Sequence, residues 1–466
     1  MKLSFVYPTF TAVENQPNIK AVAENYGVFP PLSLAYVAGI ADSLNEHKIQ
    51  FIDGNALKLT PEEILKQLKA FSPDIVFMTI TTYMFHENLS WIRLIKKNLN
   101  AKIIVGGQHL ALYSKETLAY EDIDIALIGE AEDTLPELLN ALKTNSPLNN
   151  INGIGYRYGK NIIITLPKPK KKDIDNLPYP ARKYLPNHLY HSFISQKKNF
   201  TGIMTSRGCP YQCTFCEQKT GDFRGRSAKD VMKELIECYH DYNVREFEIF
   251  DPLFTTNKQR VIDLCKEMIK SGLKFDWSVR SRVDRVDDEL LSWMSKANCK
   301  RIYFGIESGN SQVLKNLKKD LDIPKIKEAI SLTKKYNIDR FGYFMVGNPG
   351  ETVETIKDTI NLAVSLDLNF AQFSRFSILP GTGIYEEWKK ENKYDYWKEF
   401  ISDKSKRKTM PLYNCKLSEK EIEDWIKKAY YRFYFRPNFM LKSLAKIKSF
   451  DEFKRSAKAA IQMTTS

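Results

Sequence analysis

Apolar and amphipathic segments alternate along the first part of the chain. Each apolar segment has the length of a buried strand, and the stretches between them carry apolar residues three and four positions apart, as helices do. The apolar segments are 3–7, 49–52, 74–80, 102–105 and 123–128. Five short strands separated by helices predict a doubly wound parallel sheet of the flavodoxin-like type.

Polar and glycine-containing turns follow these predicted strands. Ligands of doubly wound sheets bind beyond the carboxyl ends of the strands, so we expect a binding site at these turns. The turns are Asp53-Gly54-Asn55, 79–82, Gly106-Gly107 and Gly129-Glu130.

The alternation stops near residue 147 and resumes near residue 200. Between these points, the segments 154–158 and 162–166 flank Gly159-Lys160-Asn161 and predict a β-hairpin. A connection rich in Pro and Lys follows the hairpin.

Strand and helix then alternate six more times. The predicted strands are 202–206, 246–251, 275–279, 301–306, 340–346 and 370–377. Six units are too few for a closed eight-stranded barrel. We therefore expect a partial (β/α)6 barrel with its site on the carboxyl-terminal rim.

The last part of the chain is helical and basic. A capping box at 418–421 begins a helix whose apolar residues form one stripe. The stripe consists of Ile422, Trp425, Ile426, Ala429 and Phe433. The whole pattern predicts a flavodoxin-like domain at 1–146, a hairpin and linker at 147–198, a barrel at 199–385 and a helical extension at 386–466.

Composition places the chain among folded proteins, because 43% of its residues are hydrophobic and 12% are aromatic. No stretch reaches the roughly 18 apolar residues that a membrane span needs. Residues 1–8 lack the charged start and long apolar core of a signal peptide. We therefore expect a cytoplasmic protein.

The formal net charge is +14, and more than half of this excess lies in residues 386–466. Such a charge suggests a nucleic acid or an anionic surface as partner, and equally a solvated Lys-rich surface. The run 430–436 is aromatic and basic and can stack bases or lie among lipid headgroups. Its one-sided stripe favours packing of the helix onto the barrel instead. Nucleic acid is therefore not favoured, and peripheral membrane contact stays open.

Three of the seven cysteines, Cys209, Cys213 and Cys216, follow the first predicted barrel strand directly. Three thiolates within eight residues can wrap one compact metal centre. Iron–sulfur clusters and structural zinc sites normally have four protein ligands, and no fourth Cys or His lies close in the sequence. An open coordination position is typical of a catalytic centre. A zinc site and three unrelated thiols remain the alternatives.

The cysteine motif resembles the signature of the radical S-adenosylmethionine (SAM) superfamily. Its spacing of three and then two residues is matched by the three cysteines, and its aromatic residue by Phe215. The resemblance implies a [4Fe–4S] cluster held by Cys209, Cys213 and Cys216, with SAM on the fourth iron. It also implies cleavage of SAM to a 5′-deoxyadenosyl radical that abstracts a substrate hydrogen.

Later strand ends resemble further motifs of this superfamily. The resemblance implies that Asp251 contacts the SAM ammonium, that Arg280 pairs with the SAM carboxylate and that Glu307 also contacts SAM. The segments 347–352 and 379–382 are similar to the loops after the fifth and sixth strands.

The first domain resembles the cobalamin-binding class of the same superfamily. The resemblance implies that seven residues contact cobalamin: Asp53, Asn55, Thr79, Gly106, Gly107, Gly129 and Glu130. Asn55 occupies the place where the older cobalamin fingerprint has a cobalt-ligating His, so that ligand is excluded. His86 and His109 lie in strand-end loops, where a surface or loop role is favoured over cobalt ligation.

The resemblance implies an enzyme that transfers a methyl group to an unactivated centre of a small-molecule or lipid substrate, with an electron donor such as flavodoxin or ferredoxin. Its catalytic residues stay unassigned. A non-methylating reaction remains open, namely cyclisation, oxygenation or carbon–carbon coupling, with cobalamin as redox cofactor or absent. So does a binding module that uses the basic tail. Methylthiolation of transfer RNA is disfavoured, because no Cys precedes Cys209.

Overall fold

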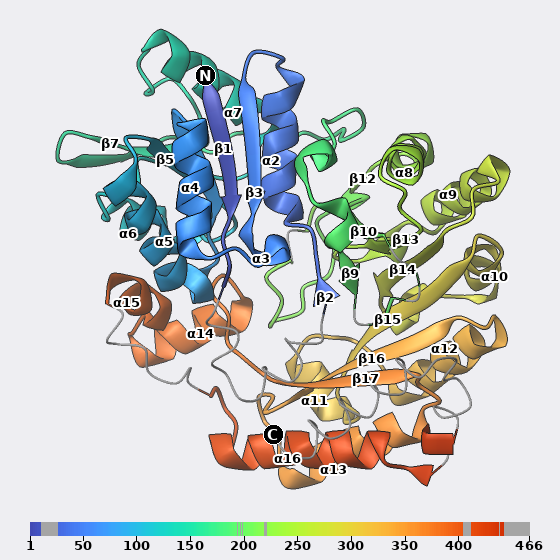
Figure 1. Cartoon of the computed structure of the whole chain (residues 1–466). Helices are drawn as coiled ribbons and strands as arrows, with labels where there is room; N and C mark the ends of the chain where they lie inside the picture. The colour runs from blue at the N-terminus through green and yellow to red at the C-terminus, as the bar shows by residue number, and fades with distance from the viewer. Residues whose placement is uncertain are drawn as a thin grey trace.

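The computed structural model describes residues 1–10, 27–192, 194–195, 197, 199–218, 221–403, 412–437 and 439–441. Figure 1 shows an N-terminal α/β domain, an open barrel of strands and helices beside and below it, and C-terminal helices that contact both.

The N-terminal sheet confirms the predicted flavodoxin-like fold. Five parallel strands lie in the order β3-β1-β4-β5-β6, and the direction of the connections reverses between β1 and β4. Such a switch point is where doubly wound sheets bind ligands. The strands are β1 (Lys2–Tyr7), β3 (Lys48–Asp53), β4 (Ile75–Thr79), β5 (Lys102–Gly106) and β6 (Ile125–Leu127).

Helices bury both faces of this sheet. On one face α2 (Leu32–Ser43) and α7 (Ala131–Thr144) enclose an apolar cluster that includes Phe5 and Phe77. On the other face α4 (Pro61–Phe71), α5 (Phe85–Asn98) and α6 (Leu110–Leu118) cover Val6 and Met78.

The predicted hairpin extends the N-terminal sheet. Strand β7 (Ile154–Tyr158) pairs antiparallel with β6, and β8 (Asn161–Ile164) pairs antiparallel with β7, so the sheet has seven strands. The connection to the barrel therefore begins after the hairpin. It contains the short helices η2 (Arg182–Tyr184) and η3 (Asn187–Leu189) and the strand β9 (His191–Ser192), which pairs with β2 (Gly27–Val28).

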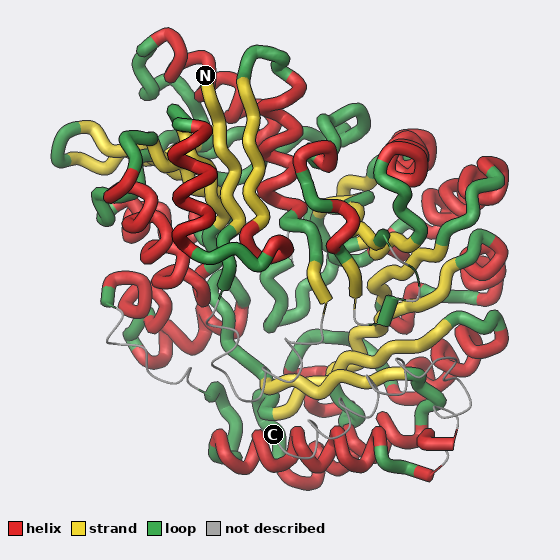
Figure 2. Tube along the Cα trace, viewed as in Figure 1, coloured by secondary structure: helices red, strands yellow, loops and turns green. Residues whose placement is uncertain are grey.

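Six parallel strands in chain order form the open barrel that the pattern predicts, with helices on the outer side (Figure 2). The strands are β10 (Phe200–Ile203), β13 (Glu246–Ile249), β14 (Asp276–Ser281), β15 (Cys299–Glu307), β16 (Asp339–Val346) and β17 (Phe370–Arg375). The helices are α8 (Ala228–Asp241), α9 (Lys258–Ser271), α10 (Asp288–Lys296), α11 (Ser311–Asn316), α12 (Ile323–Lys335) and α13 (Val353–Ser365).

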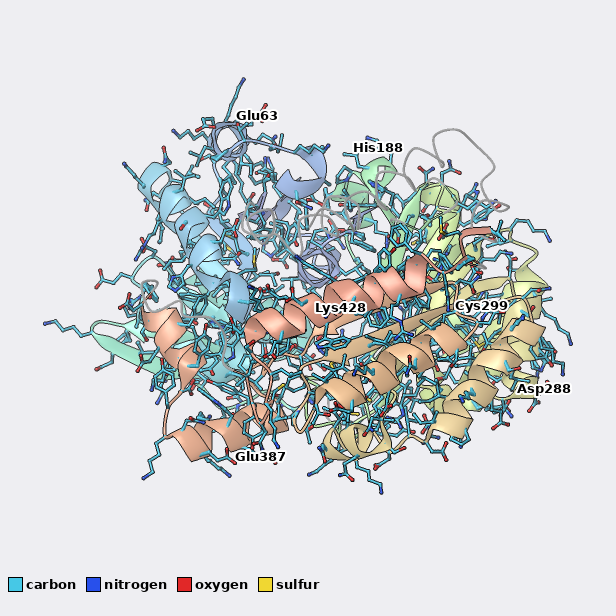
Figure 3. All side chains as sticks on the ribbon, turned by 90° about the horizontal axis from the view of Figure 1, so that it is seen from below. Glu63, His188, Asp288, Cys299, Glu387 and Lys428 are labelled. Carbon is cyan, nitrogen blue, oxygen red and sulfur yellow. The ribbon has the colours of Figure 1, made fainter. Side chains whose placement is uncertain are left out.

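The helices after the barrel contact different parts of the molecule. Helices α14 (Gly383–Asn392) and α15 (Tyr396–Ser402) join the apolar cluster of the N-terminal domain, where Tyr385 and Trp397 are buried. Helix α16 (Glu419–Tyr434) instead packs on the barrel with Phe433 fully buried, as its apolar stripe predicts. In the view from below, the helix that carries Lys428 lies across the barrel (Figure 3).

Two tyrosines of α16 also bind the outer edge of β17. The backbone N–H groups of Phe373 and Ala371 donate to the hydroxyls of Tyr430 and Tyr434, at 3.2 and 3.1 Å, and Tyr434 donates back to the Ala371 carbonyl at 2.9 Å. An unpaired strand edge invites association with other chains. Helix α16 therefore protects the open side of the barrel.

No helix in the described part of the chain is long and apolar enough to span a bilayer. The basic residues of 442–466 lie outside the described residues, and the role of their charge stays a prediction.

We expect Phe433→Ala to lower the free energy of unfolding by about 3–5 kcal/mol, because it leaves a cavity between α16 and β17. Tyr431→Ala is the control on the exposed side of the same helix, where 61% of the residue is accessible. It should cost no more than about 0.5 kcal/mol. Urea unfolding followed by circular dichroism measures both, and equal losses would show that α16 is not anchored by its buried side.

Candidate active site

The three clustered cysteines lie on one folded loop at the carboxyl-terminal rim of the barrel. The loop is closed by a backbone hydrogen bond from Gly221 N–H to the Cys209 carbonyl at 3.1 Å. Within it, Cys216 N–H donates to the Cys213 carbonyl at 3.2 Å, and Gln218 N–H donates to Cys216 Sγ at 3.3 Å. Cys213 is buried, and the other two thiols are partly exposed.

The charges around this loop suit thiolate ligands. Burial raises the pKa of the Cys213 thiol, and the cations of Lys319 and Arg282 oppose that rise. Burial also raises the pKa of Cys216. A metal centre binds the deprotonated form, so nearby cations favour loading of the site. The donor set fits an iron–sulfur cluster with one position left for another ligand.

Two aromatic residues of the loop lie under cations of the barrel. The Arg282 guanidinium lies 3.9 Å from the centre of the Tyr211 ring, and the Lys319 ammonium lies 5.7 Å from that of Phe215. Phe215 also packs against the apolar cluster in which residues of the N-terminal domain, the barrel and helices α14 and α15 meet. The loop thus lies beside the cluster that joins the two domains.

Asp251 binds the backbone just before this loop, and its expected contact with SAM stays a prediction. Its fully buried carboxylate accepts hydrogen bonds from the N–H and hydroxyl of Thr205, at 2.6 and 2.5 Å, and from those of Ser206, at 2.9 and 2.7 Å. Four donors already surround the carboxylate, which therefore fixes the backbone that leads to Cys209.

Arg280 and Glu307 line the barrel, as the strand pattern predicts. Arg280 donates to Glu248 at 2.7 Å, and its guanidinium lies 4.5 Å from the Phe250 ring centre. Glu307 accepts from Lys319 at 2.9 Å and has a φ of 69° beside an irregularity in the β15–β16 register. Such strained backbone often occurs at functional sites. Their contacts with SAM stay predictions.

At the N-terminal sheet, Asp53 and Glu130 have partners within the chain, and their expected contacts with cobalamin stay predictions. The buried Asp53 carboxylate accepts from Ala56 N–H at 2.9 Å and from the Tyr190 hydroxyl at 2.7 Å. Glu130 pairs with Arg224 at 2.5 Å and with Arg207 at 3.1 Å, both from the barrel. The two carboxylates therefore fasten the N-terminal domain to the connection and to the barrel.

Three glycines lie at the carboxyl ends of β5 and β6. A side chain on Gly107 would lie 2.5 Å from the Ile80 carbonyl, so the fold itself requires that glycine. At Gly106 and Gly129 an added Cβ would meet no atom within 4 Å. The chain therefore leaves room beside these strand ends, next to Thr79 of β4. Asn55 lies in the short helix α3 (Gly54–Leu57) at the same edge.

Both candidate histidines have partners within the chain, and His109 has no ring nitrogen left for cobalt. His86 Nε2 lies 2.5 Å from the Phe400 carbonyl of α15. His109 is bound through both nitrogens, to Thr82 at 2.9 Å and Thr117 at 2.8 Å. Because Thr117 donates its own hydroxyl to the Tyr113 carbonyl, it accepts from His109 Nε2–H. Burial lowers the pKa of His109 to about 4, so the ring is neutral. The strand ends fit a bound group that takes no imidazole from either loop.

A buried ion network beside the rim was not predicted. Arg182 and Glu234, both fully buried, lie 2.7 Å apart, and Arg226 pairs with the same Glu234 and with Asp230 at 2.7 Å. The sequence places Asp230 and Glu234 one turn apart on α8, but it does not show which cations reach them.

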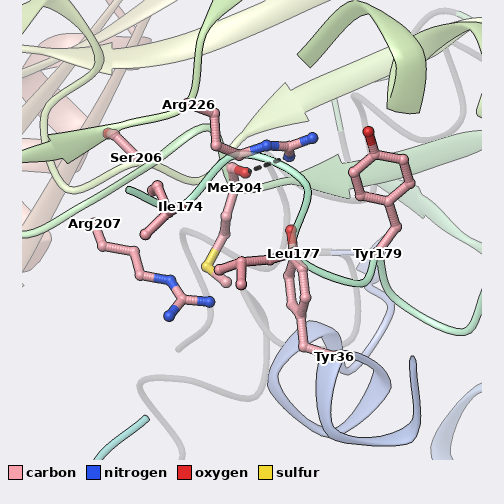
Figure 4. Close-up of a pocket in the computed structure, with 8 residues that line it drawn as sticks. All are labelled: Tyr36, Ile174, Leu177, Tyr179, Met204, Ser206, Arg207 and Arg226. Carbon is pink, nitrogen blue, oxygen red and sulfur yellow. Dashed lines mark hydrogen bonds between the residues drawn. The ribbon is translucent and has the colours of Figure 1, made fainter. Parts of the chain in front are cut away.

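A small cavity lies beside this network, between α2, the connection and the end of β10 (Figure 4). Its volume is about 20 Å³, which is room for one water molecule. Tyr36 and Arg207 line it from opposite sides of the domain boundary, and Arg226 beside them donates to the Met204 carbonyl at 3.0 Å.

The carboxyl-terminal rim of the barrel and the carboxyl-terminal edge of the N-terminal sheet meet at this boundary between the domains. Met345 and Leu379 of the rim pack against the same apolar cluster as Phe215. Glu217, next to Cys216, lies close enough to Tyr83 of the N-terminal domain to interact with it electrostatically. The thiol loop therefore lies against the side of the N-terminal sheet where ligands are expected.

Two family models match the chain. One, described as the radical SAM superfamily, matches residues 203–363, and the other, described as the B12 binding domain, matches residues 19–139. They correspond to the barrel and to the N-terminal sheet.

Relatives cover the chain almost completely. An uncharacterised methyltransferase of Pyrococcus horikoshii is 31% identical over 461 residues, which are 95% of this chain and 95% of the relative. The anaerobic magnesium-protoporphyrin IX monomethyl ester cyclase of Cereibacter sphaeroides is 28% identical over 457 residues, 94% of this chain and 71% of the relative.

A solved structure shares the whole fold. The cobalamin-dependent S-adenosylmethionine radical enzyme OxsB, with aqua-cobalamin and S-adenosylmethionine bound, has a TM-score of 0.72 and 18% sequence identity. The match covers 99% of this chain and 72% of that chain.

We expect Glu234→Gln to destabilise the protein by about 3–5 kcal/mol, because it leaves the buried Arg182 and Arg226 without the carboxylate that they share. Glu328→Gln, the same change at an exposed position of α12, is the matched control and should cost under about 0.5 kcal/mol. Urea unfolding measures both. A Glu234→Gln variant as stable as the control would show that the network does not stabilise the fold.

Proposed function

The chain belongs to the radical SAM superfamily and carries a B12-binding domain, and from this premise we propose that it is a cobalamin-dependent methyltransferase acting on an unactivated centre. The observation that carries the proposal is the position of the thiol loop. It lies at the barrel rim, where Glu217 of the loop interacts electrostatically with Tyr83 of the N-terminal domain, and Arg207, two residues before Cys209, pairs with Glu130.

Cys209, Cys213 and Cys216 would hold a [4Fe–4S] cluster, and Phe215, Arg280 and Glu307 would face SAM. Asn55, Thr79 and the three strand-end glycines would border cobalamin. When bound, cluster and SAM supply a carbon radical, and cobalamin supplies a methyl group.

The protein's own contribution is placement. Asp251 fixes the backbone that enters the thiol loop, and the Arg207 and Arg224 pairs with Glu130 fix that loop relative to the N-terminal sheet. Phe215 is partly buried in the apolar cluster at the boundary between the domains. Such rigid placement is what a protein adds to cofactor chemistry.

The chemistry needs one electron from outside, for which we propose flavodoxin or ferredoxin. The positive net charge of this chain suits association with an acidic donor, because opposite charges steer the encounter. A small-molecule substrate is proposed, and a lipid substrate would account for peripheral contact with a membrane.

Ring formation without methyl transfer is the second candidate, because a cyclase is 28% identical over 94% of this chain. Protein purified without oxygen and supplied with hydroxocobalamin tests the first candidate. No binding removes methyl transfer in favour of the second candidate, whereas binding of about one cobalamin per chain is compatible with both, because ring formation can use cobalamin as redox cofactor.

We expect the reconstituted protein to bind four iron atoms and to produce 5′-deoxyadenosine from SAM and a strong reductant. Cys213→Ala should lose the cluster and at least 100-fold of this activity, because three thiolates are needed to hold it (about 2.7 kcal/mol in activation free energy). Cys415→Ala, a partly buried cysteine away from the loop, is the control and should retain both. Iron analysis and chromatography measure the outcome. A Cys213→Ala variant with an intact cluster would exclude the proposed ligand set.

A further inference from the structure

Arg282 follows β14 and is held in one orientation behind the thiol loop. Its Nε and one terminal nitrogen donate to the two carboxylate oxygens of Asp284, at 2.8 and 3.1 Å. The same terminal nitrogen donates to the Lys319 carbonyl at 2.7 Å. The guanidinium carbon lies 3.9 Å from the centre of the Tyr211 ring. Only 5% of the residue is accessible.

The other terminal nitrogen of Arg282 points to a sulfur. It lies 3.9 Å from Cys213 Sγ, within the range of an N–H···S hydrogen bond. The guanidinium is always charged, and its fork geometry lets Asp284 and Lys319 fix one side while the other side remains directed at the thiol. The residue is therefore oriented before any cluster is bound.

Two other cations near the loop are placed differently. Lys319 is paired with Glu307 at 2.9 Å, and its ammonium lies near the Phe215 ring. Arg285 is exposed and donates to the Tyr211 hydroxyl rather than to sulfur. Arg282 thus combines burial with direct contact to a cysteine sulfur.

We propose that Arg282 is a positioning residue that raises the reduction potential of the iron–sulfur cluster through its hydrogen bond to Cys213 Sγ. The inference rests on the proposed function, in which Cys213 is a cluster ligand. A thiolate bound to iron keeps negative charge, and that charge grows when the cluster accepts one electron from the external donor. A charged N–H donor stabilises the more negative, reduced state, since hydrogen bonds to the sulfurs help set cluster potentials.

The test compares the midpoint potential of the reconstituted full-length protein with that of three variants, by electron paramagnetic resonance at a series of fixed potentials. Arg282→Met removes charge and donor. Arg282→Lys keeps the positive charge but lacks the planar set of N–H donors of the guanidinium. Arg285→Met removes an exposed charge beside the same loop and is the control.

We expect Arg282→Met to lower the ratio of reduced to oxidised cluster about tenfold at a fixed potential, a shift of about 59 mV to more negative values for one electron. Arg282→Lys should shift the potential in the same direction by less, and Arg285→Met should leave it unchanged. A merely structural role would change iron content without moving the potential of the clusters that form.

An unshifted potential in Arg282→Met with full iron content overturns the inference while leaving the proposed function intact. If Arg282→Met binds no iron, Arg282→Lys decides: a more negative potential supports the inference, and an unchanged one overturns it. A wild-type protein that forms no cluster overturns the proposed function and this inference together.

Discussion

The backbone of residues 202–206, at the end of β10, is bound by four charged side chains, and the arrangement of the site depends on this anchoring. Arg182 donates to the Gly202 carbonyl at 2.9 Å and Arg226 to that of Met204 at 3.0 Å. Arg260 donates to the Thr205 carbonyl at 2.5 Å, and Asp251 accepts from Thr205 and Ser206. Burying these charges is costly, and it is tolerated for Arg182 and Arg226 because they share Glu234 and Arg226 also pairs with Asp230. The thiol loop begins three residues later, so these contacts also fix where the loop starts.

The C-terminal helices complete the same assembly from the other side. Helices α14 and α15 bury aromatic side chains against the N-terminal domain, and α16 closes the outer edge of β17. One continuous segment after the barrel thus contacts both domains. This explains the aromatic content of the extension better than nucleic-acid or lipid binding does, since Tyr430, Phe433 and Tyr434 face the barrel.

Much of the fold could be predicted because it depends on local pattern. The strands of both sheets lie where short apolar runs predict them, and the capping box at Ser418 begins α16 as expected. The thiol loop could be found because its three cysteines lie close together in the sequence. The hairpin was recognised, but its pairing with β6 was not, since the spacing of apolar residues says nothing about which strand a hairpin joins.

The individual tasks of the site residues could not be predicted, because they depend on partners far away in the chain. Asp251 binds a residue 46 positions earlier, Glu130 pairs with an arginine 94 positions later, and His86 contacts a carbonyl 314 positions away. Each of these residues follows a strand, which is a sound reason to expect a ligand contact. The structure uses the same positions to fasten loops and domains, and the contacts of these residues with the proposed cofactors stay predictions, as do those of Arg280, Glu307 and the strand-end glycines.

The central claim is that one chain brings an iron–sulfur cluster and a cobalt cofactor to facing edges of two domains. Anomalous diffraction from crystals of the loaded enzyme, recorded at the iron and cobalt absorption edges, tests it most directly. The account predicts an iron peak bounded by the sulfurs of Cys209, Cys213 and Cys216, and a cobalt peak across the boundary, beyond the carboxyl ends of β1, β4 and β5. An iron peak away from these sulfurs, or no cobalt peak at that edge of the sheet, would contradict it.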